Sequence, residues 1–273
     1  MPLVLEFRAE TTVAIEADGL VQAALAATTV RAVEDALVWH GNRQERAGEF
    51  FRISGDLSDG QVVMRGEFNG VHRLGEGMTE GSLHIDGNVG RHLGAAMRGG
   101  QIHVVGSAGD WVGAEMRDGL IHVHGNAGQR VGAAYVGSER GMRGGAILID
   151  GDAGDQIGHT MRRGLIAVGG DAGSFAAINM IAGTVLVAGA CGERPGAAMR
   201  RGTLALLGPA PELLPTFRRA SRCRPLFLRV YLKWLIDRGF AIDRRAMDDE
   251  YVLNSGDHLN TGRGEILVRI ATP

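Results

Sequence analysis

Apolar and polar residues recur along residues 61–202 in lines of 19 residues. One line reads SLHIDGNVGRHLGAAMRGG (82–100) and the next reads QIHVVGSAGDWVGAEMRDG (101–119). Glycine recurs at positions 6, 9, 13 and 19 of a line and methionine at position 16. The line 120–145 carries a seven-residue insertion, and the first line, 61–81, has two extra residues. Self-similarity at a fixed short period is typical of a solenoid.

Each line begins with a short alternating strand over positions 1–5. Positions 2 and 4 are apolar in every line, and because side chains alternate across a strand they are expected to face one core. Positions 8, 12 and 16 carry small, aliphatic and methionine residues that are expected to line the same core. The pattern predicts that the following residues are buried: Val104, Ile121, Val131 and Met161.

The glycines are expected to mark corners, where the backbone has a positive φ or leaves no room for a Cβ atom. We expect Gly128→Val or Gly154→Val to damage folding, because a branched side chain is strained at a positive-φ corner.

This periodicity predicts an all-β fold, a right-handed parallel β-helix of seven to eight 19-residue coils over residues 61–207. Adjacent coils lie about 4.8 Å apart, so the stack is expected to be on the order of 35 Å long. The left-handed hexapeptide β-helix is the rival fold. It requires an aliphatic residue in every hexad, which the spacing G-x-x-G-x-x-x-G does not supply.

The segments outside the repeat are expected to cover its ends, since a solenoid must hide its open sheet edges. Residues 1–60 form the predicted N-terminal cap, with strands at 3–7 and 12–15 and helical character over 19–38. Residues 208–273 form a C-terminal extension with a helix over 226–236 and strand character over 251–270. For the basic, amphipathic helix, both a second cap and a partner-docking element remain open.

Composition excludes several classes of protein. The chain is 45% hydrophobic and 22% charged with a net charge of −2, which gives no global reason to expect nucleic acid or an anionic membrane as partner. No signal peptide is recognisable in MPLVLEF, and no apolar run reaches the length of a membrane span. Cys191 and Cys223 form no CxxC pair, so we expect no disulfide or metal cluster and a cytoplasmic location.

No set of residues in the repeat predicts catalysis. Ser138 has no acid–base partner at a matching position, and the recurring glycines do not open helices as phosphate loops do. His84, His103 and His122 occupy position 3 of three successive lines, but no Asp, Glu or Cys shares that column. We therefore expect a stacked surface or interface ladder and neither a metal site nor a catalytic residue on this chain.

An arginine column is the strongest candidate for binding. Position 17 carries arginine in five lines: Arg98, Arg117, Arg143, Arg162 and Arg200. Each follows the methionine of its line, so its side chain should point outward. Three interpretations remain open: a solvated ridge, a docking surface for an acidic subunit face, or a site for an anionic ligand.

The coils resemble the C-terminal β-helix domain of the glutamate synthase large subunit. They are more similar to the C subunit of formylmethanofuran dehydrogenase, and this second resemblance covers nearly the whole chain. It includes the M-R-x-G line endings, the inserted GSERGMRGG (137–145) and the terminal GDHLNTGRGEILV (256–268).

The resemblance implies a non-catalytic scaffold subunit of a hetero-oligomeric complex. The bacterial formyltransferase/hydrolase complex of this family is expected to pass a formyl group from tetrahydromethanopterin to a methanofuran-type carrier and to release formate. Its chemistry resides on amidohydrolase-like and formyltransferase subunits, so no cofactor is expected on this chain alone. The carrier's glutamate-rich tail would suit the arginine column.

Two alternatives remain open. One is the C subunit of a molybdenum or tungsten formylmethanofuran dehydrogenase, and the other is a stand-alone subunit related to the glutamate synthase domain. The strong preference for arginine over lysine favours the bacterial complex.

Overall fold

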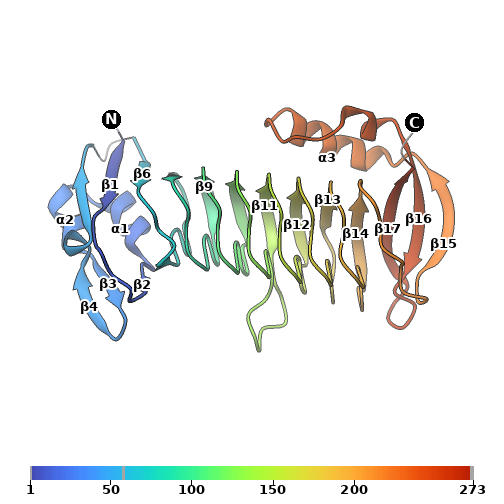
Figure 1. Ribbon diagram of the computed structural model, residues 1–273, viewed down its shortest axis with the longest axis horizontal. Helices are drawn as coiled ribbons and strands as arrows, with labels where there is room; N and C mark the ends of the chain where they lie inside the picture. The colour runs from blue at the N-terminus through green and yellow to red at the C-terminus, as the bar shows by residue number, and fades with distance from the viewer. Residues whose placement is uncertain (1, 57–58, 271–273) are drawn as a thin grey trace.

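The computed structural model describes residues 2–56 and 59–270 and is mostly β. One sheet has 13 strands and a second has four, and the helices are few and short (Figure 1). No helix in the described part of the chain is long and apolar enough to cross a membrane.

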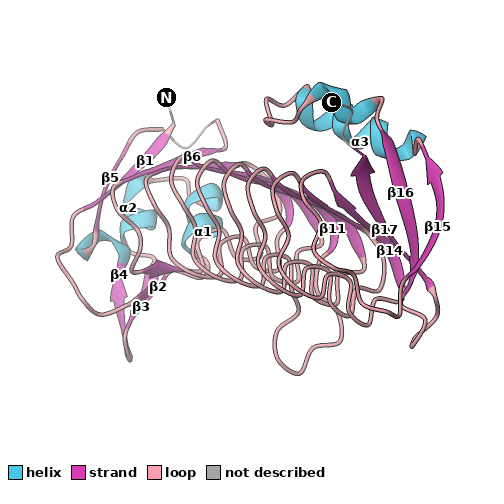
Figure 2. Ribbon diagram, turned by 45° about the vertical axis from the view of Figure 1, so that its right-hand side comes forward, coloured by secondary structure: helices cyan, strands magenta, loops and turns pink. Residues whose placement is uncertain are grey.

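The repeat forms the centre of the large sheet. Its strands are β6 (Gln61–Arg65), β8 (Ser82–Asp86), β9 (Arg98–Val104), β10 (Asp118–Val123), β11 (Arg143–Ile149), β12 (Arg163–Val168), β13 (Thr184–Val187) and β14 (Arg201–Leu206). Neighbours are parallel, and equivalent positions of successive lines pair, as in Ile102 with Ile121. The position-8 residues also bridge from line to line, as in Ala108 with Ala127. Each line is therefore one coil of the stack, which Figure 2 shows obliquely.

The predicted interior positions are buried. Val104, Ile121, Val131 and Met161 are each 0% exposed, which confirms the prediction. The position-16 methionines are all fully buried as well. Residues 135–141 leave the stack as a loop beside β11 (Figure 1), since an insertion in one coil cannot enter the packed interior.

The corners follow two different rules. Glycines at positions 13 and 19 have positive φ, as at Gly94 (61°) and Gly100 (80°). Gly128 and Gly154 do not, so the expected positive-φ strain was wrong for them. A Cβ at Gly128 would lie 2.7 Å from the backbone nitrogen of Asp110, in the preceding coil. Lack of space between coils explains these glycines.

The N-terminal segment adds strands to both sheets. β1 (Leu3–Phe7) pairs in parallel with β6 and antiparallel with β5 (Phe51–Ser54). The four-stranded sheet consists of β2 (Ile15–Glu16), β3 (Leu37–His40), β4 (Arg43–Arg46) and β7 (Val71–His72). A short 3₁₀ helix, η1 (Ala47–Glu49), connects β4 to β5.

The prediction of helical character over 19–38 was only partly right. The chain forms two short helices, α1 (Leu20–Ala26) and α2 (Val30–Glu34), and then β3. Thr29 is extended and its side chain accepts a hydrogen bond from the backbone N–H of Ala32, which caps α2 and ends any continuous helix. The strand expected at 12–15 is only the two-residue β2.

The C-terminal segment folds back over the stack. Its elements are β15 (Arg218–Cys223), α3 (Leu226–Ile236), η2 (Arg244–Met247), β16 (Glu250–Gly256) and β17 (Arg263–Ile270). α3 has the predicted bounds, and β17 pairs in parallel with β14, so a strand outside the repeat extends the stack. β16 and β15 follow antiparallel at that end.

α3 covers an apolar patch on the outer face of the coils (Figures 1 and 2). From β11 onwards, position 3 is apolar, and these residues pack in one buried cluster with one face of the helix. The cluster includes Leu148, Ala167 and Leu186 of the coils and Leu228, Leu232 and Leu235 of α3. The chain's own C-terminal segment therefore covers this face.

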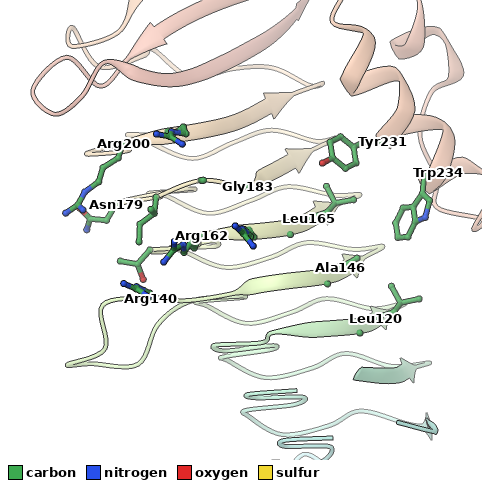
Figure 3. Close-up of a pocket in the computed structure, with 18 of the residues that line it drawn as sticks. Leu120, Arg140, Ala146, Arg162, Leu165, Asn179, Gly183, Arg200, Tyr231 and Trp234 are labelled. Carbon is green, nitrogen blue, oxygen red and sulfur yellow. The ribbon is translucent and has the colours of Figure 1, made fainter. Parts of the chain in front are cut away.

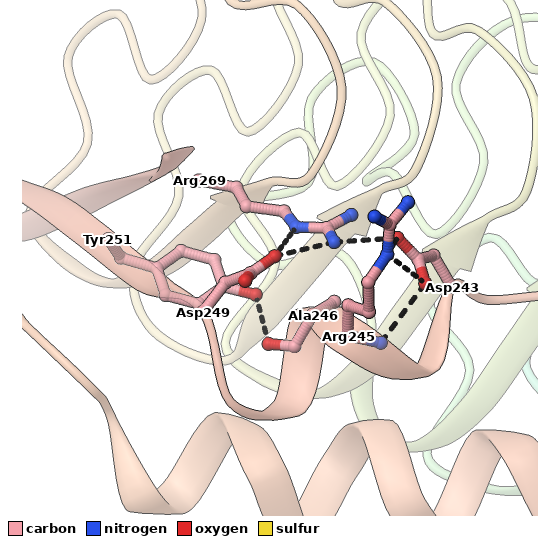
Figure 4. Close-up of polar contacts among 6 residues, drawn as sticks. All are labelled: Asp243, Arg245, Ala246, Asp249, Tyr251 and Arg269. Atoms are coloured by element: carbon pink, nitrogen blue, oxygen red, sulfur yellow. Dashed lines mark hydrogen bonds and ion pairs between the residues drawn. The ribbon is translucent and has the colours of Figure 1, made fainter. Parts of the chain in front are cut away.

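A partly buried ion-pair network fastens the segment after α3 to β17 (Figure 4). Arg269 is 9% exposed, and its guanidinium lies 2.6 Å from Asp249 and 2.7 Å from Asp243. The hydrogen bond from Arg269 lowers the pKa of Asp243 to about 2. The hydroxyl of Tyr251 donates to the carbonyl of Ala246 at 2.7 Å. These contacts fix α3 in place above the coils.

Candidate arginine-lined binding site

A pocket of about 1400 Å³ lies between α3 and the outer face of the coils (Figure 3). The strand starts of β10, β11 and β12 supply its floor, with Leu120, Ala146 and Leu165. α3 supplies one wall, with Tyr231 and Trp234. The opposite side is formed where each coil turns into its strand, and the inserted loop contributes its last residues.

Arginine dominates the charged residues of this pocket. Seven arginines line it: Arg140, Arg162, Arg163, Arg200, Arg201, Arg238 and Arg263. The only acidic residue in the lining is Glu139. Arg238 stacks on the ring of Trp234 at 3.9 Å. Within residues 2–56 and 59–270, none of the seven arginines makes an ion pair within 4 Å.

This excess of positive charge favours an anionic ligand. Arginine stays protonated at all physiological pH values, so the like charges persist and repel one another. A carboxylate accepts two parallel hydrogen bonds from one guanidinium, which makes arginine well suited to carboxylate recognition. Tyr231, Trp234 and the floor residues add apolar surface, so the pocket suits a carboxylate-bearing chain with some apolar character.

The five predicted arginines occupy equivalent backbone positions. Each backbone N–H donates to the carbonyl of the methionine one coil earlier, as from Arg117 to Met97 at 2.7 Å and from Arg162 to Met142 at 2.8 Å. The same bond, at 2.7–2.8 Å, is made by all five: Arg98, Arg117, Arg143, Arg162 and Arg200.

The structure brings only two of the five into the pocket. Arg162 and Arg200 line it, whereas Arg98 and Arg117 are exposed and lie outside its lining. Arg143 is half-buried, and its Nε atom has no hydrogen-bond partner among the described residues.

Most of the remaining pocket residues were not assigned to a site from the sequence. Arg163 and Arg201 directly follow Arg162 and Arg200 in the chain. Arg140, in the inserted loop, and Arg238, after α3, come from segments without periodicity. The folded-back position of α3 brings them together.

A second polar cluster lies on the same outer face, beside α3. His84, His103 and His122 pair in register, as the repeat predicts. His122 is buried where the α3 segment begins to cover the coils, with its ring 6.4 Å from that of Phe240.

The histidine column has no carboxylate of its own, but a neighbouring column supplies one. Asp150 stands at position 5 of the next coil. It lies 2.8 Å from Nε2 of His122 and 2.6 Å from Nδ1 of His124. Together these three side chains offer ligand atoms that all lie within 4.8 Å of one another, so they could hold a metal ion.

Comparisons with known proteins give a consistent result. No family model matches the chain. Over 91 residues, or 32% of this chain, it is 34% identical to the C subunit of the tungsten-containing formylmethanofuran dehydrogenase 2 of Methanothermobacter thermautotrophicus and 33% identical to that of Methanothermobacter wolfeii. The chain spans about a third (34%) of the length of these curated relatives.

One solved structure is similar over the full length. It is a chain in the crystal structure of the formyltransferase/hydrolase complex (FhcABCD) from Methylorubrum extorquens in complex with methylofuran. The two chains are 33% identical with a TM-score of 0.89, and the match covers 98% of this chain and 100% of that one.

Proposed function

Because the chain belongs to the family of formylmethanofuran dehydrogenase C subunits, we propose that it is a non-catalytic scaffold subunit of a formyltransferase/hydrolase complex. In this proposal the complex converts formyl-tetrahydromethanopterin to formate through a formylated methanofuran-type carrier, in the cytoplasm. The observation that carries the proposal is the full-length likeness to a chain of such a complex. Amidohydrolase-like and formyltransferase subunits would be its partners.

The chemistry of the pocket agrees with a binding role. Its charged residues are seven arginines and Glu139, and arginine neither donates nor accepts a proton at neutral pH. The thiol of Cys191 is equally unsuited to catalysis, because burial raises its pKa to about 11.

We assign the architecture as a right-handed parallel β-helix over 61–207, between an N-terminal cap (1–60) and a C-terminal extension (208–273). The in-register parallel pairing of β6 to β14 supports it. A crystal structure of the purified chain tests both the hand and the boundaries. A left-handed coil, or strands that pair out of line register, would contradict the assignment.

The two parts of the arginine column receive different roles in this proposal. The pocket at Arg162 and Arg200 lies beside α3 and suits an extended carboxylate-bearing segment, such as the glutamate tail of the carrier. The complex of the similar chain holds methylofuran, which favours a carrier as ligand. Arg98 and Arg117 lie on open coils and suit the acidic face of a partner subunit.

A specific observation favours one alternative. The curated relatives are subunits of a tungsten-containing formylmethanofuran dehydrogenase, so the chain could serve a redox complex of that kind. Purification of the native complex, followed by measurement of the partner masses and of the tungsten or molybdenum content, distinguishes the formyltransferase/hydrolase complex from the redox complex. Partners of the formyltransferase and amidohydrolase classes without either metal support our proposal, and a metal-containing redox subunit overturns it.

Paired arginine variants test the binding roles. We expect Arg162→Gln with Arg200→Gln to weaken retention of the carrier, and Arg98→Gln with Arg117→Gln to weaken assembly, each more strongly at low salt, where charge pairs are least screened. The two pairs are matched, because all four residues occupy the same backbone position. Folding should change little, since surface exchanges cost within about 0.5 kcal/mol.

The mixed pair Arg117→Gln with Arg162→Gln should weaken both carrier retention and assembly. Parental carrier retention and assembly in all three double variants, at every ionic strength, would show that the column is a solvated ridge.

A further inference from the structure

We propose that His122, His124 and Asp150 form a binding site for one divalent transition-metal ion of the zinc class. The site lies on the outer face of the coils and is separate from the arginine-lined pocket, whose lining includes none of the three residues.

The repeat itself creates the arrangement. His122 lies in β10, and His124 is the first residue after that strand. The two histidines are two positions apart, so both imidazoles point to the outer face. Asp150 follows β11 and stands opposite His124, because Val123 pairs with Ile149 just before them. His122 is then the diagonal neighbour of Asp150, within reach of a carboxylate.

The distances are close to those of a metal centre. Zinc binds imidazole nitrogen at about 2.0–2.1 Å, so two ligands of a tetrahedral ion lie about 3.3 Å apart. Here the carboxylate oxygens are 2.8 and 2.6 Å from the two ring nitrogens. A small outward rotation of Asp150, whose side chain is 26% exposed, would open room for the ion.

The ligand set and its environment indicate the kind of metal. Two imidazoles and one carboxylate suit zinc and similar transition ions better than calcium or magnesium, which prefer oxygen ligands. His122 is buried against Phe240, which holds one ligand rigidly. The side chain of His124 is 47% exposed, so an ion can enter from solvent and a water molecule can complete the coordination.

The neighbouring coils show that the arrangement is local. His84 and His103 hold the same position as His122 in earlier coils, but the residue diagonal to His84 is Val105 and the one diagonal to His103 is His124. Among the described residues, His122, His124 and Asp150 are the group that could hold a metal ion. A ladder of stacked histidines alone does not require that two imidazoles contact the same carboxylate, as His122 and His124 contact Asp150.

The experiment uses the purified full-length chain, stripped with a chelator and dialysed against Zn²⁺. Bound metal is measured by mass spectrometry, and Co²⁺ binding by its visible absorption. We expect one equivalent of Zn²⁺ per chain and a Co²⁺ spectrum typical of a site with nitrogen and oxygen ligands. His124→Gln and Asp150→Asn should each weaken binding at least about tenfold, since removal of outer partners alone costs that much.

His84→Gln is the matched control, because it removes an imidazole from the same column where no carboxylate is diagonal to it. It should retain full binding. His124 is exposed, so its variant should keep the parental melting temperature without metal, which separates lost binding from lost folding. Equal Zn²⁺ binding by the parent, His124→Gln and Asp150→Asn, or no binding by the parent, would overturn the proposal.

Discussion

Glycine at position 9 of a coil lies close to the backbone of the preceding coil, as at Gly128. A Cβ at Gly128 would lie 2.2 Å from a carboxylate oxygen of Asp110 and 2.7 Å from its backbone nitrogen. Protein interiors are close-packed, so an added side chain must displace the backbone of a neighbouring coil.

We therefore expect Gly128→Val to lower the free energy of unfolding by at least about 1–3 kcal/mol, the usual cost of overpacking. Urea denaturation measures it. Gly70→Val is the control, because a Cβ at Gly70 meets no atom within 4 Å and its φ is not positive. Equal stabilities of the two variants would contradict the close-approach explanation.

Partly buried histidines make stability depend on pH. Burial is the main cause that lowers the pKa of the imidazole at four positions: His72, His92, His103 and His159. In the unfolded chain these groups titrate near their ordinary pKa of about 6.5. As pH falls through this value, the unfolded state takes up protons that the folded state does not, so the stability present above it is lost.

Urea denaturation at pH 7.5, 6 and 5 should show a falling free energy of unfolding. His103→Gln should reduce this slope, because it removes one of the imidazoles whose pKa is lowered by burial. A pH-independent stability between 7.5 and 5 would show that the buried imidazoles do not control the transition.

At the scale of elements, α3 depends on contacts made after it in the chain. The helix lies on the coils through its leucine face, and the Arg269 network fixes the segment that follows. A buried charge that loses its partner is strongly destabilising, so the network should matter more than exposed ion pairs do.

Asp249→Ala should therefore lower the free energy of unfolding by about 3 kcal/mol, because it leaves the buried guanidinium of Arg269 with Asp243 alone. Asp248→Ala is the matched control, since its carboxylate is 71% exposed and pairs with Arg229 at the surface. Chemical denaturation checks both. Similar small decreases in the free energy of unfolding of the two variants would mean that the ion pairs of Arg269 do not stabilise the fold in solution.

At the scale of the whole molecule, the stack is a long surface with a cationic pocket between α3 and the outer face of the coils. We expect the isolated chain neither to transfer nor to hydrolyse formyl groups, because the pocket arginines cannot serve as acid or base at neutral pH. Formate release from formylated substrate, measured with partner-free chain, tests this. Formate release that copurifies with this chain, and that is lost when pocket residues are substituted, would contradict the expectation.

The sequence by itself determined the coils. Strand positions and buried columns follow from local alternation and from glycine spacing, which act over a few residues and repeat in each line, and the bounds of α3 follow from the amphipathic pattern after Pro225. The same local reading failed at 19–38, where the Thr29 cap divides one apparent helix into two. It also gave no warning of positive φ at non-glycine residues such as His92 and Ala96.

Only the tertiary structure decided the sites. The pocket exists because α3 folds back over particular coils, so Arg162 and Arg200 line it while Arg98 and Arg117, at the equivalent backbone position, lie outside it. Asp150 meets the two histidines although 25 residues separate it from His124. The seven-residue insertion loops out, so His124 and Asp150 stay at the same position of adjacent coils. Side chains from different columns meet through the stacking of coils, which a search for partners within one column does not capture.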